Sequence, residues 1–74
     1  MKITIESTTK TVELNGIVAR VWEGQTDSGI PVHCFVTRIG VHREQDSSQF
    51  ERELVECRAP SALIDATYPA RMVL

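Results

Sequence analysis

Two cysteines and two histidines supply the metal-ligating and nucleophilic side chains of this 74-residue sequence. They include the ligand types that zinc prefers: His33, Cys34, His42 and Cys57. Their arrangement argues against a shared metal ion, because adjacent strand residues such as His33 and Cys34 point to opposite faces. A Cys34 nucleophile with a histidine base is a second hypothesis, but a thiol in the middle of an apolar strand is packed and inert. We expect no catalytic residue, no metal site and no cofactor.

Acidic side chains in the second half of the chain are the candidates for acid–base chemistry. They are Glu44, Asp46, Glu51, Glu53 and Glu56. Their spacing is typical of a solvated loop and helix surface, and none has an obviously apolar setting. No Gly-rich phosphate loop is present either, since the four glycines are isolated. The sequence therefore predicts a protein that is not an enzyme.

Two turns predict an antiparallel β-meander around these residues. The pair Asn15-Gly16 stands between two β-prone runs and indicates a type I′ hairpin, which would place Lys10 opposite Val21. The triplet Asp27-Ser28-Gly29 indicates a three-residue hairpin loop, which would place Trp22 opposite Cys34. With both registers, one face of the sheet becomes continuously apolar. Its members are Val12, Leu14, Ile17, Ala19, Val21, Phe35, Ile39 and Val41.

The run 29–41 is predicted to be the central strand, because it has apolar residues on both of its faces. Shorter strands are expected at the edges. Residues 2–6 and 10–14 form either two strands or one bent strand. Residues 71–74 end the chain on an apolar run, which predicts a final strand in this sheet or in a partner's sheet.

A helix is predicted from Ser48 to about residue 58, with a capping box formed by Ser48 and Glu51 and a stop at Pro60. Its apolar stripe has helical spacing: Phe50, Leu54 and Cys57. A strand is the competing interpretation. If the helix covers the first apolar face of the sheet, the opposite face is left open.

That opposite face carries the candidate binding site, which consists of Arg20, Trp22, Val36 and Arg38. Tryptophan and arginine are enriched at interface hot spots. Such a face can mediate self-association, bind a protein, or clamp an anionic small ligand. The alternative is that residues 59–70 and the tail fold back and cover it.

The composition of the chain narrows the classes of protein to which it can belong. Hydrophobic residues make up 42% and charged residues 24% of the chain, and the net charge is −2. These values are ordinary for a globular protein and do not resemble the basic footprint of a general nucleic-acid binder. No apolar run approaches the roughly 20 residues that span a bilayer, and the N-terminus does not resemble a signal peptide. We expect one soluble, cytoplasmic domain over residues 1–74, with reduced cysteines.

Five segments together resemble a short protein type of tailed-phage and prophage genomes: MKITIESTTKTVEL, NGIVARVWEG, GIPVHCFVTRI, SQFEREL and the ending RMVL. The resemblance covers nearly the whole chain and transfers no site residues. It implies a phage-encoded accessory protein of the host cytoplasm, a type that often acts by binding.

These observations predict an α+β domain: an antiparallel β-meander of three central strands plus one or two short edge strands, with one helix packed on one face. The expected function is non-enzymatic binding of a host protein or of an anionic small ligand, in a homo-oligomer. The alternative is a phage structural or assembly component that self-associates through exposed strand edges.

Overall fold

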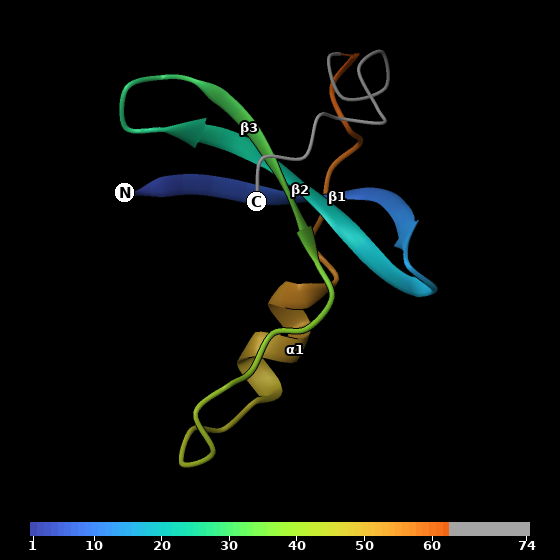
Figure 1. Cartoon of the computed structure of the whole chain (residues 1–74). Helices are drawn as coiled ribbons and strands as arrows, with labels where there is room; N and C mark the ends of the chain where they lie inside the picture. Colours follow the sequence, from blue (N-terminus) through green and yellow to red (C-terminus); the bar gives the residue numbers. More distant parts are fainter. Residues whose placement is uncertain (63–74) are drawn as a thin grey trace.

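The computed structural model of the chain describes residues 1–62 (Figure 1). These residues form a three-stranded antiparallel sheet in the order β1-β2-β3, followed by one short helix. The elements are β1 (Ile3–Leu14), β2 (Ile17–Thr26), β3 (Pro31–Val36) and α1 (Ser48–Leu54). A small α+β fold with a β-meander is therefore confirmed. The strand predicted at 71–74 lies outside the described residues.

The first hairpin has the predicted turn. Asn15 and Gly16 have φ angles of 51° and 84°, as a type I′ turn requires. Leu14 lies opposite Ile17, as predicted. Residues 3–6 and 10–14 belong to one bent strand, β1, which settles the alternative left open above.

The predicted pairing of Lys10 with Val21 is wrong, because β1 contains a bulge. The register shifts between Ser7 and Thr11, so that Ser7 lies opposite Trp22. Within the bulge, the buried Thr8 hydroxyl donates a hydrogen bond of 2.6 Å to the Val21 carbonyl. The hydroxyl thus provides a hydrogen-bond partner for a backbone carbonyl that the interrupted pairing of β1 with β2 would leave without one.

The second hairpin follows the predicted register. Gly29 has a φ of 87°, and the Thr26 amide donates to the Ile30 carbonyl at 3.0 Å. Trp22 lies opposite Cys34. The strand is shorter than predicted, however, since it ends at Val36. Among the described strands β2 is central and β3 lies at the edge, so the central position predicted for 29–41 is not found in the described part of the sheet.

The core of the described part of the chain is small. Ala19 and Val21 on β2 are its two buried apolar side chains, and both have no exposed surface. Other members of the predicted apolar face remain partly exposed, including Ile17 at 58% and Ile39 at 44%. The pattern therefore identified the face correctly, but only its centre is buried.

The helix is confirmed and the competing strand is excluded, but its ends differ from the prediction. Ser47, not Ser48, occupies the cap position and makes no side-chain capping bond. The Asp46 carboxylate, one residue earlier, makes the capping bonds instead. It accepts a hydrogen bond from the Ser48 amide at 2.9 Å and another from the Ser48 hydroxyl at 3.0 Å. The helix ends at Leu54, well before Pro60, so Cys57 is not part of its stripe.

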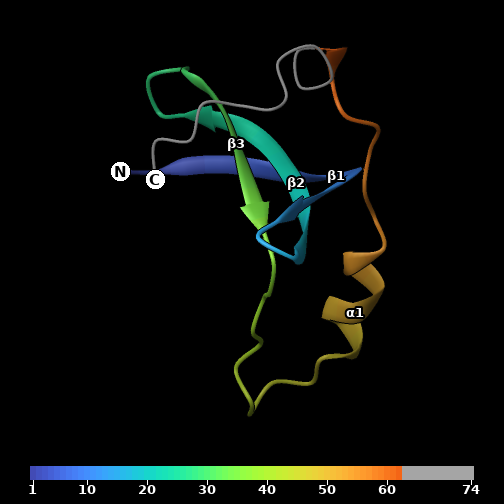
Figure 2. The same cartoon turned by 45° about the vertical axis from the view of Figure 1, so that its right-hand side comes forward.

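The connection between β3 and α1 runs away from the sheet before it turns back into the helix (Figure 2). No residue of α1 is buried, so close packing of the helix on one sheet face stays a prediction. After α1, the chain returns towards β1 (Figures 1 and 2). In the described residues, no helix is long and apolar enough to cross a membrane.

Candidate binding groove

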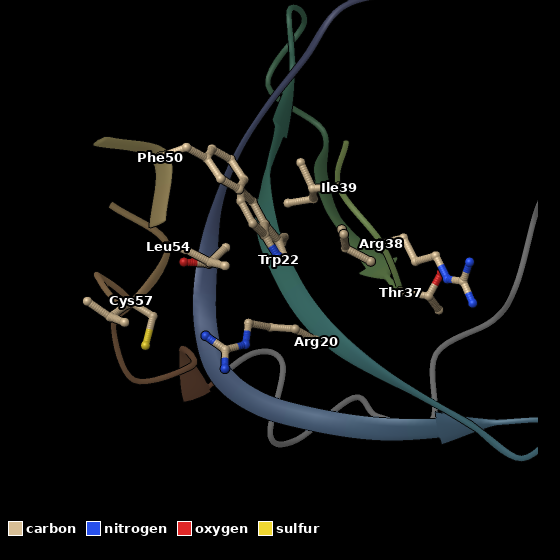
Figure 3. A pocket seen from close by; sticks show the side chains of 11 residues that line it. Arg20, Trp22, Thr37, Arg38, Ile39, Phe50, Leu54 and Cys57 are labelled. Carbon is tan, nitrogen blue, oxygen red and sulfur yellow. The ribbon is translucent and has the colours of Figure 1, made fainter. Parts of the chain in front are cut away.

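A groove of about 510 Å³ lies between α1 and the sheet face that carries Trp22. All four residues of the predicted binding site line it: Arg20, Trp22, Val36 and Arg38. The other wall comes from the helix and the residues after it, chiefly Phe50, Leu54 and Val55. Figure 3 shows Phe50 and Leu54 directed towards Trp22. The helix therefore faces the second sheet face, which the prediction left open.

Regular spacing explains why these side chains meet. Arg20 and Trp22 are two residues apart on β2 and share a face, and Val36 lies opposite Arg20 on β3. Phe50 and Leu54 are four residues apart on α1 and share one side of the helix. The two walls place aromatic and aliphatic surface on both sides of the hollow.

Arg20 is the charged group within this apolar setting. Its side chain is half-buried, and it makes no hydrogen bond or ion pair with any residue of the described chain. A guanidinium offers several N–H donors in a planar fork that matches a carboxylate or phosphate. Its position beside Trp22 therefore suits an anion that also carries apolar surface.

Arg38 does not join Arg20 as predicted. Its exposed side chain points away from Arg20, on the far side of Trp22 (Figure 3). The prediction assumed that the strand continued to Val41, but β3 ends at Val36 and Arg38 follows that end. The groove therefore holds one guanidinium in its interior, and a two-arginine clamp is not formed.

A second hollow of about 380 Å³ adjoins the first and is acidic. It shares Ser7, Trp22 and Cys57 with the groove. Glu6, Glu53, Glu56 and Arg58 line it beyond those residues, so three carboxylates outnumber one guanidinium. Glu53 accepts a hydrogen bond of 2.9 Å from Gln49, whereas the Glu56 carboxylate has no partner in the described chain. Trp22 thus lies between a cationic and an anionic end.

The residues after the helix attach to the bulge of β1. The Ser7 hydroxyl donates to the Glu56 carbonyl at 3.0 Å, and the Thr9 amide donates to the Arg58 carbonyl at 2.9 Å. Thr8 and Arg58 form a parallel bridge. These contacts anchor the chain just after α1, and so help to position the helical wall of the groove.

On the first sheet face, three residues form what we call the Glu23 clamp: Glu23, Arg58 and Ser61. Glu23 is only 8% exposed. The Arg58 guanidinium donates to it and forms an ion pair with it, while the Ser61 amide and hydroxyl donate to it at 2.8 and 2.7 Å. The alternative stated above was that residues 59–70 cover the face that carries Trp22. Residues 59–62 lie at the first face instead, and residues 63–70 lie outside the described part.

Arg58 also offsets a repulsion between like charges. Glu6 lies directly opposite Glu23 across β1 and β2, a placement that destabilises a sheet. The Arg58 Nε atom lies 3.5 Å from a Glu6 carboxylate oxygen. Burial acts to raise the pKa of Glu23, but the hydrogen bonds from Arg58 and Ser61 outweigh it and hold that pKa below its ordinary value of 4.5.

The predicted metal and nucleophile candidates remain apart in the register. His33 lies opposite Glu23, and Cys34 lies opposite Trp22 on the other face. Cys34 is half-buried and Cys57 is exposed, both as free thiols. Within residues 1–62, no three His, Cys, Asp or Glu side chains come close enough to hold a metal ion.

Sequence reasoning missed the helical wall of the groove and the Glu23 clamp. The wall was missed because α1 was expected to pack elsewhere and Ile39 was assigned to the first face. For Glu23 a signal existed, since strand alternation puts this charge on the same face as the buried Val21. A buried charge in a strand calls for a partner, but the partner's position, 35 residues later, had no local signal.

In comparisons with known proteins, no family model, no curated protein and no solved structure matches this chain. The fold and site therefore define its class: a small α+β protein with an apolar groove, in which the Arg20 guanidinium has no hydrogen-bond or ion-pair partner among the described residues.

Proposed function

We propose that this chain is a non-enzymatic binding protein, encoded by a phage and acting in the host cytoplasm. Its groove binds a partner that presents an anionic group next to apolar surface. The observation that carries the proposal is the half-buried Arg20, which has no partner in the described chain and lies beside Trp22. Proximity to apolar side chains reduces the screening of this charge by water.

The size of the groove supports a binding role. Ligand sites typically occupy about 300–1,000 Å³ and combine apolar walls with a few polar groups. The groove of about 510 Å³ falls within that range and has this composition. Its rim also exposes apolar side chains, with Leu54 44% and Val55 77% exposed. This favours a protein surface as the partner, since a small ligand would leave the rim uncovered.

A pair of fluorescent probes tests the chemistry of the groove. 8-Anilinonaphthalene-1-sulfonate is an apolar anion, and N-phenyl-1-naphthylamine is its neutral counterpart. We expect Arg20→Gln to lower the affinity for the anionic probe about tenfold, because a hydrogen bond to a charged group is worth about 1.5–3 kcal/mol. The neutral probe should bind both proteins alike. Arg43→Gln is the matched control, because Arg43 is exposed and lies outside the groove.

Equal anion affinity for the wild type and Arg20→Gln would contradict the proposal. With the chemistry established, capture from host lysate on wild type, Arg20→Gln and Arg43→Gln columns identifies the partner. The partner is the molecule that the wild type and Arg43→Gln retain and Arg20→Gln loses.

A structural or assembly role is the second candidate. β3 favours it, because this strand lies at the edge of the described sheet and its six residues carry no lysine, arginine, aspartate or glutamate that would discourage pairing with another strand. Head-to-tail pairing of one sheet edge with the opposite edge of the next copy produces an open series of assemblies. We expect sedimentation velocity to resolve species larger than dimers if this role is correct, and a single small species would exclude it.

A further inference from the structure

We propose that a second copy of this chain occupies the groove, in a two-fold symmetric dimer that pairs Glu56 of each copy with Arg20 of the other. The inference rests on the proposed anion-binding role of Arg20 and names the molecule that supplies the anion. Apolar surface, charge and core size each support it.

Apolar surface continues from the groove onto its rim. Ile39, Leu54 and Val55 line the groove and are 44%, 44% and 77% exposed. Three such exposed side chains line one hollow together with Trp22 and Phe50, and apolar surface gathered in this way is of the kind that marks an interface. In the dimer, Leu54 and Val55 of each copy cover the groove of the other.

The charges of the patch are self-complementary. Ser7, Trp22 and Cys57 are common to the groove and the acidic hollow, so they lie between the two ends. Arg20 lies on one side of them and Glu56 on the other. Rotation by 180° about an axis through this middle places the positive end of one copy on the negative end of the other. Neither side chain has another partner in the described chain.

The sequence of the helical wall supplies both components at once. Leu54 and Val55 are followed directly by Glu56, so that one segment brings apolar side chains and a carboxylate to the facing groove. A small core adds a reason for association. Only Ala19 and Val21 are buried apolar residues in the described chain, and oligomerisation is a common way for small scaffolds to gain buried area.

Sedimentation equilibrium of the full chain tests the dimer. We expect the mass to approach twice the 8.3 kDa of the chain as concentration rises. Val55→Glu should raise the dissociation constant at least about tenfold, because it places a charge among the apolar side chains of the patch. Ile17→Glu is the matched control: Ile17 is 58% exposed but lies at the tip of the first hairpin, and its variant should dimerise as the wild type does.

Charge reversal tests the pairing itself. Arg20→Glu and Glu56→Arg should each weaken the dimer, and the double variant should recover most of the loss because the pair is restored with exchanged signs. Far-UV circular dichroism verifies that every variant is folded, and Val55→Lys serves as a second variant at position 55.

A wild type that stays monomeric at the highest concentration would overturn the inference, as would a dimer that Val55→Glu and Val55→Lys leave intact. The proposed function fails separately. A monomer whose affinity for the anionic probe still depends on Arg20 would contradict the proposed dimer but support the proposed binding role. A dimer whose probe affinity is unchanged in Arg20→Gln would remove the binding role.

Discussion

Gly24→Ala is expected to lower the free energy of unfolding by about 3 kcal/mol or more, the upper range for overpacked sites. A chain of 74 residues typically has roughly 4–11 kcal/mol in total. The substitution should therefore remove a large part of the stability. The melting temperature should fall by more than about 12 °C, since each kcal/mol shifts it by about 4–8 °C in a domain of this size.

The reason is the close approach of β1 to β2 at this position. A Cβ atom on Gly24 would overlap the Thr4 carbonyl oxygen and lie 2.7 Å from the Thr4 carbonyl carbon and 2.8 Å from the Ile5 Cα atom. All three are backbone atoms, so no rotamer change relieves the clash. β1 would have to move away from β2 at Ile5, which lies directly opposite Gly24.

Gly40→Ala is the control for this experiment. No atom lies within 4 Å of a Cβ added at Gly40, so an unchanged or slightly higher stability is expected, because alanine restricts the unfolded chain. Urea denaturation followed by Trp22 fluorescence measures both variants. Equal midpoints for Gly24→Ala and the wild type would show that the two strands do not approach each other as closely as the structure has them.

The parts of the fold that could be predicted depend on local chemistry. Asn15-Gly16 and Asp27-Ser28-Gly29 determine their own turns through positive φ angles, and each turn sets the register of the residues next to it. The groove residues on β2 follow from the same registers. Trp22 and Arg20 therefore lay on one face in the prediction and do so in the structure.

The features that the prediction missed depend on contacts that are distant in sequence. The bulge in β1 shifts the register between Ser7 and Thr11, and it is stabilised by contacts with Glu56 and Arg58 that no local pattern reveals. The early end of β3 similarly accounts for Arg38 pointing away from Arg20. Gly24 did leave a signal, since a glycine inside a β-prone run often marks the close approach of another backbone.

The Glu23 clamp gives the second large effect. Glu23→Gln keeps the size of the side chain but removes the charge that Arg58 and Ser61 contact. A loss of about 2 kcal/mol is expected, because hydrogen bonds to charged groups contribute about 1.5–3 kcal/mol. Glu13→Gln is the control, since Glu13 is exposed on the neighbouring strand and should change stability by less than about 0.5 kcal/mol.

The pH dependence distinguishes the ionised clamp from simple packing. Because the folded state holds the pKa of Glu23 below 4.5, it binds this proton less readily than the unfolded chain does. The stabilisation is therefore complete above the unfolded value and is lost as the pH falls through the lower, folded-state value. The difference in unfolding free energy between the wild type and Glu23→Gln should be constant above about pH 5.5 and should shrink below pH 4.5.

Urea titrations at a series of pH values measure this difference, and a difference that persists unchanged at low pH would show that the Glu23 charge is not its source.

The clamp anchors the chain just after the helix, at Arg58, and the helix forms one wall of the groove. Loss of the clamp should therefore also affect the groove from the opposite face of the sheet. Glu23→Gln is expected to weaken the binding of the neutral probe as well as that of the anionic probe, whereas Arg20→Gln weakens only the binding of the anionic probe. The two variants thus separate the shape of the groove from its charge.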